Sequence, residues 1–219
     1  AAAAVAVVHG LLGMDRVYGL YAPGFKAEPW HVGPLLNPNN LAGYLDVGIL
    51  AGPTGNGTLV REVSASGSIT STDYYSGLLV GDMGDSTITR VSTSGSVSNP
   101  LYAGGLVGYA GGQISESFST AAVTSGRYVG GLIGYWTGSA KSVVDSYATG
   151  AVTSTNGTGP RGVGGLVGDV SSAKTISTSY ATGALTFSGS SNAGGLVGRA
   201  NAAITYSSSF WDSATTGLG

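Results

Sequence analysis

Cysteine is absent from this chain of 219 residues, and histidine is scarce. Without cysteine the chain forms no disulfide and offers no thiolate to a metal ion or a substrate. The two histidines, His9 and His31, lack the H-E-x-x-H spacing with which zinc peptidases hold their metal. No G-x-S-x-G motif presents a serine nucleophile. We therefore expect no cofactor, no metal site and no catalytic residue, and we predict that the protein is not an enzyme.

Charge is equally sparse, at 9% of the residues against roughly 25% in an average soluble domain. The net charge is −2 and no basic cluster occurs, so we expect no nucleic-acid partner. No apolar run reaches the roughly 18 residues of a membrane-spanning helix. Because 42% of the residues are apolar, the composition nevertheless predicts an ordered protein.

Glycine is abundant, with 39 residues, and much of it belongs to a repeated G-G-L-V-G unit. A weaker copy at 48–52 precedes five clear copies, at 77–81, 104–108, 130–134, 164–168 and 194–198. Their final glycines are separated by 29, 27, 26, 34 and 30 residues. Such a period is typical of stacked repeat architectures.

An aromatic element follows the later copies at a near-constant distance: S-[YF]-[AS]-T at 117–120, 146–149 and 179–182, and S-F-W-D at 209–212. An aliphatic position lies beyond it at Val123, Val152 and Leu185. Each unit thus holds short runs of strand-forming residues bounded by glycine, serine and asparagine. One unit cannot bury its own apolar residues, whereas stacked units can. We assign the repeat to these residues: Gly81, Leu106, Gly108, Leu132, Gly134, Leu166, Gly168, Leu196, Gly198, Phe118, Tyr147, Tyr180 and Phe210.

The predicted fold is therefore all-β, a parallel β-solenoid (β-helix) of about six rungs in which like residues lie above like residues. We expect the leucine, the aromatic residue and the aliphatic residue to be buried in ladders. We expect the repeated glycines to form tight corners with left-handed backbone conformations. The alternative is that another backbone approaches each glycine closely.

The repeat resembles the GLUG motif, which occurs in large secreted and surface proteins of bacteria, including filamentous-haemagglutinin-like adhesins. The resemblance covers residues 48–212, which we assign to the solenoid. Residues 1–47 depart from the pattern and carry Pro29, Pro34 and Pro38, so we interpret them as an irregular N-terminal cap or adaptor. Residues 213–219 are assigned to a C-terminal tail.

The resemblance implies a non-enzymatic, extracellular structural or adhesive module, located outside the cell or on its surface. Unpaired strand edges at the solenoid ends would let such modules self-associate or join neighbouring subunits into a fibre. A host surface or a glycan is a further partner that adhesin-like proteins imply. Two alternatives remain open: a carbohydrate-binding or carbohydrate-acting β-helix, and a virion or tail-fibre component.

Two groups of residues are candidates for a site. Tyr109 and Tyr135 each follow the last glycine of a unit, and Trp136, Tyr128 and Arg127 lie near them. Stacking would place the two tyrosines side by side, where they bind a ligand or a partner, or form an intramolecular aromatic ladder.

The second group is a pair of carboxylates. Glu116 and Asp145 each lie two residues before the aromatic position, so adjacent rungs would bring them within about 5 Å. Such a pair would suit a glycosidase or a weak Ca²⁺ site. A solvated polar corner is the favoured interpretation, because Thr178 and Ser208 occupy the same position in later repeats.

Overall fold

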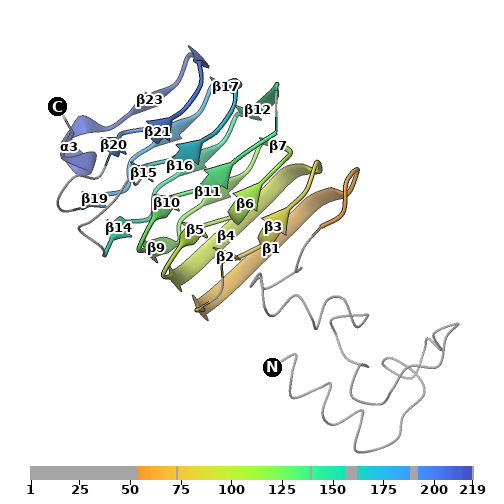
Figure 1. Ribbon diagram of the computed structural model, residues 1–219, viewed down its shortest axis with the longest axis horizontal. Coiled ribbons are helices and arrows are strands. Elements are labelled where there is room, and N and C mark those ends of the chain that lie inside the picture. Colours follow the sequence, from red (N-terminus) through yellow and green to blue (C-terminus); the bar gives the residue numbers. More distant parts are fainter. Residues whose placement is uncertain (1–53, 73, 139, 156–161, 188–191, 219) are drawn as a thin grey trace, which may run out of the picture.

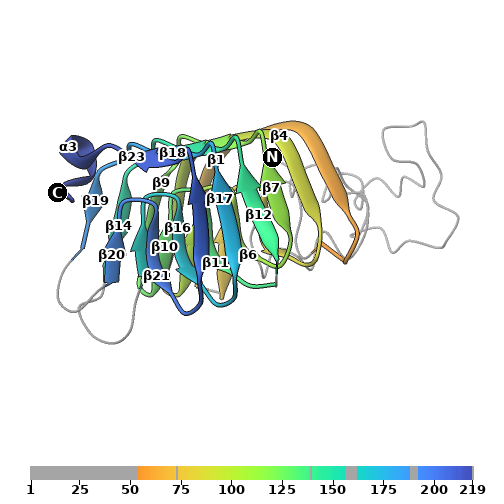
Figure 2. The ribbon, with the colours of Figure 1, turned by 90° about the horizontal axis from the view of Figure 1, so that it is seen from above.

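The computed structural model describes residues 54–72, 74–138, 140–155, 162–187 and 192–218. Within them the chain winds into a parallel β-solenoid whose turns stack along one axis (Figures 1 and 2). Residues 1–47, His9, His31 and the weak repeat copy at 48–52 lie outside the described residues. No helix in the described ranges is long and apolar enough to cross a membrane.

The strands form three sheets. The wide sheet has thirteen strands: β1 (Leu59–Thr70), β4 (Thr87–Asn99), β7 (Gln113–Ser115), β8 (Phe118–Ser119), β9 (Ala122–Ser125), β12 (Lys141–Val144), β13 (Tyr147–Ala148), β14 (Val152–Ser154), β17 (Lys174–Ser177), β18 (Tyr180–Ala181), β19 (Leu185–Thr186), β22 (Ile204–Ser207) and β23 (Phe210–Trp211). The first narrow sheet contains β2 (Tyr75–Gly77), β5 (Tyr102–Gly104), β10 (Tyr128–Gly130), β15 (Gly162–Gly164) and β20 (Asn192–Gly194). The second narrow sheet contains β3 (Val80–Met83), β6 (Val107–Ala110), β11 (Ile133–Trp136), β16 (Val167–Val170) and β21 (Val197–Ala200).

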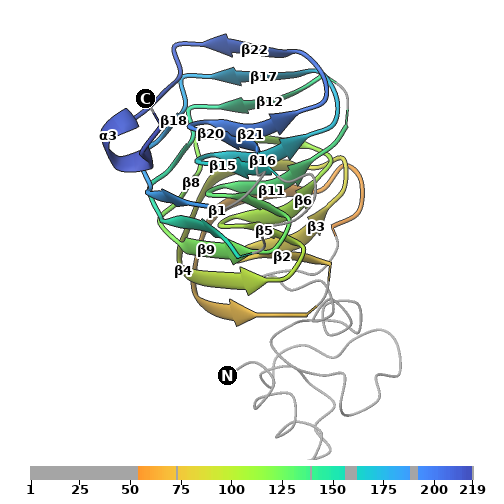
Figure 3. The ribbon, with the colours of Figure 1, turned by 60° about the vertical axis from the view of Figure 1, so that its left-hand side comes forward.

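One turn of the solenoid crosses the wide sheet and then both narrow sheets. In the first two turns the wide-sheet segment is one long strand, β1 or β4, whereas later turns break it into three short strands. Five turns are complete, and β22 and β23 begin a sixth (Figure 3). The predicted all-β parallel solenoid is therefore confirmed.

Strand register follows the repeat. Every paired strand is parallel, and equivalent residues face each other, as with Tyr147 and Tyr180 or Gly130 and Gly104. Val152 likewise pairs with Val123 on one side and Leu185 on the other. The predicted stacking of equivalent residues is therefore correct for the turns that the structure describes.

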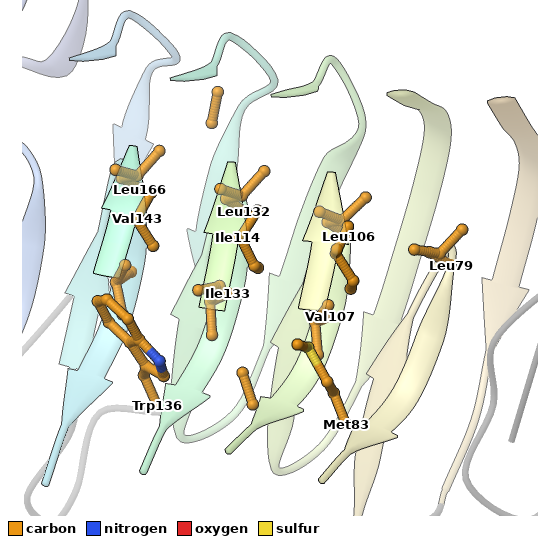
Figure 4. Packing of buried hydrophobic residues seen from close by; sticks show 14 of the residues in the cluster. Leu79, Met83, Leu106, Val107, Ile114, Leu132, Ile133, Trp136, Val143 and Leu166 are labelled. Carbon is orange, nitrogen blue, oxygen red and sulfur yellow. The ribbon is translucent and has the colours of Figure 1, made fainter. Parts of the chain in front are cut away.

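Two apolar cores run along the axis. The larger one lies between the second narrow sheet and the wide sheet, and Leu106, Leu132 and Leu166 stack in it with no exposed surface (Figure 4). The smaller one joins the first narrow sheet to β9 and β14 through residues such as Val129 and Val152. Each buried leucine stabilises the fold by about 1.5–3 kcal/mol.

The repeated glycines do not have left-handed backbones, so that expectation is wrong. Among the described glycines, positive φ angles occur at Gly57, Gly67, Gly95, Gly138 and Gly217, none of which is a glycine of the G-G-L-V-G units. A Cβ added to Gly134 would lie 2.6 Å from the carbonyl oxygen of Gly108 and 2.9 Å from two backbone atoms of Ala103. The repeated glycines therefore let the two narrow sheets approach backbone to backbone, which is the alternative stated above.

Left-handed backbone occurs instead at a column of non-glycine residues. These residues lie two positions before the aromatic ladder or its serine equivalents: Glu62, Arg90, Glu116, Asp145, Thr178 and Ser208, with φ between 46° and 57°. There the wide sheet turns a corner, and the solvated polar corner proposed for Glu116 and Asp145 is confirmed in this geometric sense.

The predicted C-terminal tail contains a one-turn helix, α3 (Ser213–Thr216), at the end of the stack (Figure 2). Its N-cap is Asp212, whose carboxylate accepts a hydrogen bond from the Ala214 amide at 2.9 Å. Gly217 ends it in a left-handed conformation with φ 71°.

Candidate functional site

Five tyrosines gather where the two narrow sheets meet. Tyr75, Tyr102 and Tyr128 are the first residues of β2, β5 and β10, and Tyr109 and Tyr135 are paired neighbours in β6 and β11. We call these residues the tyrosine cluster. The ring centroids of Tyr109 and Tyr135 lie 5.5 Å apart, as the stacking of turns predicted.

The cluster is closely interlocked. Tyr109 lies 4.7 Å from Tyr75, and Tyr135 lies 5.7 Å from Tyr102 and 5.4 Å from Tyr128, measured between ring centroids. These contacts across the two narrow sheets are those of an intramolecular aromatic cluster, and such pairs stabilise a fold by about 0.5–1.5 kcal/mol each. Binding of a ligand or partner by Tyr109 and Tyr135, which are half-buried, stays a prediction.

Cations lie over this cluster. The guanidinium of Arg127 is 5.2 Å from the centroid of Tyr128 and 5.9 Å from that of Tyr102. Arg199 lies 5.0 Å from the same Tyr128 ring and donates a hydrogen bond to its hydroxyl at 2.7 Å. Tyr128 thus contacts two arginines and is only 4% exposed, whereas the side chain of Arg127 is exposed to solvent.

Asp169 continues the column of Tyr109 and Tyr135 into the next turn. It is fully buried, forms an ion pair with Arg199 and accepts a hydrogen bond from Asn201 at 3.0 Å. Burial raises the pKa of the Asp169 carboxyl, and the hydrogen bond from Arg199 opposes this shift. Sequence inspection missed this residue because the repeat places a tyrosine at its position in the two preceding turns.

Trp136 does not belong to the binding surface, so its assignment as a binding residue is wrong. Its side chain has no exposed area, packs in the larger core and donates its indole N–H to the carbonyl of Gly112 at 3.0 Å. Residues in a strand alternate sides, so Trp136 points inward when Tyr135 points outward.

Lys174 covers one side of this indole. Its ammonium lies 5.1 Å from the Trp136 ring centroid and donates hydrogen bonds to the Gly138 carbonyl and, at 2.6 Å, to the Ser172 hydroxyl. Burial, together with the smaller effect of the nearby charge of Lys141, lowers the pKa of Lys174 to about 8.

Glu116 and Asp145 lie in equivalent positions of adjacent turns, as predicted, and both are exposed. Glu116 pairs with Arg90 at 3.7 Å, and the same arginine pairs with Glu62 at 2.9 Å. This column therefore alternates in charge over three turns, which suits a structural corner better than a pair of catalytic carboxylates. No group of three or more His, Cys, Asp or Glu side chains that could hold a metal ion occurs in the described ranges.

The aromatic ladder of Phe118, Tyr147, Tyr180 and Phe210 is present but not buried. Adjacent rings are nearly parallel, at 3–6°, with centroids 4.7–5.2 Å apart. The ladder lies on the outer face of the wide sheet, and Phe210 is 57% exposed. The expectation of a buried aromatic ladder is therefore wrong, because the inward side at this point is taken by Ser119, Ala148 and Ala181.

A buried serine ladder runs beside the aromatic one and was missed at the sequence level. The Ser146 hydroxyl donates to the Val144 carbonyl at 2.7 Å and accepts from the Ser117 amide at 3.2 Å. The same two bonds recur at Ser117, Ser179 and Ser209. Each hydroxyl thus replaces the strand partner that the amide loses at the left-handed corner, which explains the serine before each aromatic residue.

Comparison with known proteins identifies the repeat. A family model described as the GLUG motif matches residues 99–124. The chain carries the GLUG motif. The matched GLUG segment begins at the last residue of β4, crosses β5 and β6, and returns through β7 and β8 into β9. One GLUG motif therefore corresponds to one complete turn of this solenoid. No curated protein and no solved structure matches the chain.

Proposed function

We propose that this GLUG solenoid is a non-enzymatic, extracellular structural module that assembles with neighbouring subunits through its ends. Support comes from the GLUG motif and from the low charge, and above all from the C-terminal end of the described array. There β20 and β21 are the last strands of the two narrow sheets within the described residues, next to β15 and β16.

The end surface is also apolar. A recess of about 580 Å³ opens there, lined mainly by Leu196, Val197, Tyr206, Trp211 and Leu218. Tyr206 is 50% exposed and Trp211 is 45% exposed. In each earlier described turn the leucine equivalent to Leu196 packs against the G-G-L-V-G unit of the following turn. A strand-turn-strand segment of the same kind from a neighbouring subunit would therefore fit against Leu196.

Non-enzymatic action is supported by the side chains at the corner column. Glu116 is neutralised by Arg90, and its neighbour Asp145 is exposed to solvent. A glycosidase acid needs a raised pKa, which normally comes from burial or from an unpaired neighbouring carboxylate. We therefore assign these carboxylates to the fold.

Sedimentation of the full chain over a wide concentration range tests the assembly. We expect species larger than a monomer to grow with concentration, and the double variant Tyr206→Lys, Trp211→Lys to remain monomeric because it places two charges on the apolar end. Thr149→Lys adds a charge on the exposed flank of the middle turns and serves as the control, with unchanged assembly. A wild-type chain that stays monomeric at the highest concentrations would refute the proposal.

A further inference from the structure

The aromatic ladder stops abruptly at Phe118. Tyr147 covers one face of the Phe118 ring at 4.7 Å and an interplanar angle of 3°. On the other side of the Phe118 ring the strand register places Ser92 and then Ser64, so no aromatic ring continues the stack there. Among the described residues, the Phe118 ring has this single aromatic neighbour and presents its other face to the first two turns.

A recess lies against that free face. Its volume is about 320 Å³, and Phe118 forms one wall. Ala65 and Thr93 line its floor with their backbone, because their side chains are buried on the inner face of the sheet. Because residues alternate sides along β1 and β4, every outward position around this floor carries a small polar side chain.

The rim of the recess is made of hydroxyl groups. They belong to Ser64, Ser66, Ser92, Ser94 and Thr120. The Ser64 and Ser92 hydroxyls hydrogen-bond each other at 2.8 Å. This pair of hydroxyls occupies the two turns next to the Phe118 ring. A hydroxyl both donates and accepts hydrogen bonds, which suits a ligand whose own groups do the same.

Charge does not reach into the recess. No lining residue is ionisable, and the neighbouring corner residues Glu62, Arg90 and Glu116 are paired with one another. The recess offers no opposite charge to an ionic ligand. A fully apolar ligand would bury the serine hydroxyls without forming hydrogen bonds to them, which is unfavourable. The lining therefore favours a neutral ligand with one apolar face and a rim of hydroxyl groups.

We propose that this recess binds a neutral hexopyranose unit of a glycan. The C–H face of the sugar lies on Phe118, where the next ring of the ladder would otherwise stack, and its hydroxyl groups exchange hydrogen bonds with the serines. The open part of the ladder spans two turns, roughly 10 Å along the axis, which accommodates one or two sugar units. The site lies on the flank of the solenoid and is independent of assembly through the ends.

Saturation-transfer NMR on the full chain tests the site with methyl glucoside, methyl galactoside, N-acetylglucosamine and their β-linked disaccharides. Ser92→Phe is the decisive variant, because it adds a ring to the ladder, fills the recess and keeps the fold. We expect at least one neutral sugar to bind and Ser92→Phe to weaken that binding by tenfold or more. Tyr180→Leu removes a ring of the same ladder away from the recess, and we expect binding to be unchanged.

Three results would overturn the proposal. The first is the absence of binding by every neutral sugar at millimolar concentration. The second is binding that survives Ser92→Phe, which would place the sugar elsewhere. The third is a preference for phenol or glucuronate over the neutral sugars, which would contradict the chemistry assigned to the lining. Sedimentation of the same variants is measured separately, so failure of the sugar site and failure of end-to-end assembly are distinguishable.

Discussion

Replacing Gly134 with alanine tests whether the repeated glycines act by close approach. Gly134 lies in the second narrow sheet and faces the backbone of β5 in the first. The added methyl carbon would lie 2.6 Å from the Gly108 oxygen and 2.9 Å from the nitrogen and carbonyl carbon of Ala103. Carbon atoms in good contact lie about 3.5–4.0 Å apart, so the two sheets must separate by roughly 0.5–1 Å at this turn.

The expected cost follows from what has to move. Overpacking a core with one methyl group costs about 1–3 kcal/mol when side chains can adjust. The obstructing atoms at Gly134 are backbone atoms of adjacent turns, and separating them also weakens the contacts of the tyrosine cluster. We therefore expect a loss of about 3 kcal/mol or more in the free energy of unfolding, and a melting temperature lower by roughly 10 °C.

Urea and thermal unfolding followed by circular dichroism provide the measurement. Gly55→Ala is the matched control, because a Cβ there meets no atom within 4 Å, and we expect it to be neutral or slightly stabilising. Gly134→Asn separates the two explanations: asparagine is tolerated at left-handed positions, but here it should be as harmful as alanine. A Gly134→Ala protein within about 1 kcal/mol of the wild type would refute close approach as the role of this glycine.

Two further substitutions test the serine ladder and the buried lysine. Ser146→Ala should lower the free energy of unfolding by about 1–3 kcal/mol, because it leaves the buried Ser117 amide without its acceptor. Urea unfolding should show no such loss for the control variant Ser207→Ala, whose side chain is exposed. Equal losses in the two variants would contradict the role of the serine ladder. Because the pKa of Lys174 falls from 10.5 to about 8 on folding, the folded state releases this proton first, and stability should rise by on the order of 2 kcal/mol between pH 8 and 10. Lys174→Met should abolish that rise in urea titrations, and a rise that persists in the variant would assign it to another group.

The strand order of the solenoid was predictable because the signal is repeated. Five copies of one pattern predict that equivalent residues stack, and the burial of Leu106, Leu132, Leu166 and Leu196 follows from that alone. The side of the sheet on which a residue lies was harder to predict. Trp136 was placed on the wrong side although it alternates normally with Tyr135 in β11. The Phe118 ladder was placed on the wrong side because the left-handed corner two residues before it breaks the alternation along the wide sheet.

Sequence alone determined that this chain is a stack of repeated turns, that Tyr109 and Tyr135 are neighbours, and that the chain has no cysteine and few charged residues. Only the tertiary structure decided which faces these residues occupy. It showed that the repeated glycines mark backbone contact between two sheets, that serine hydroxyls satisfy the amides at the corners, and that the aromatic ladder lies outside. The physical reason is that each of these roles depends on atoms about thirty residues away, in the adjacent turn, which the local pattern of one repeat cannot specify.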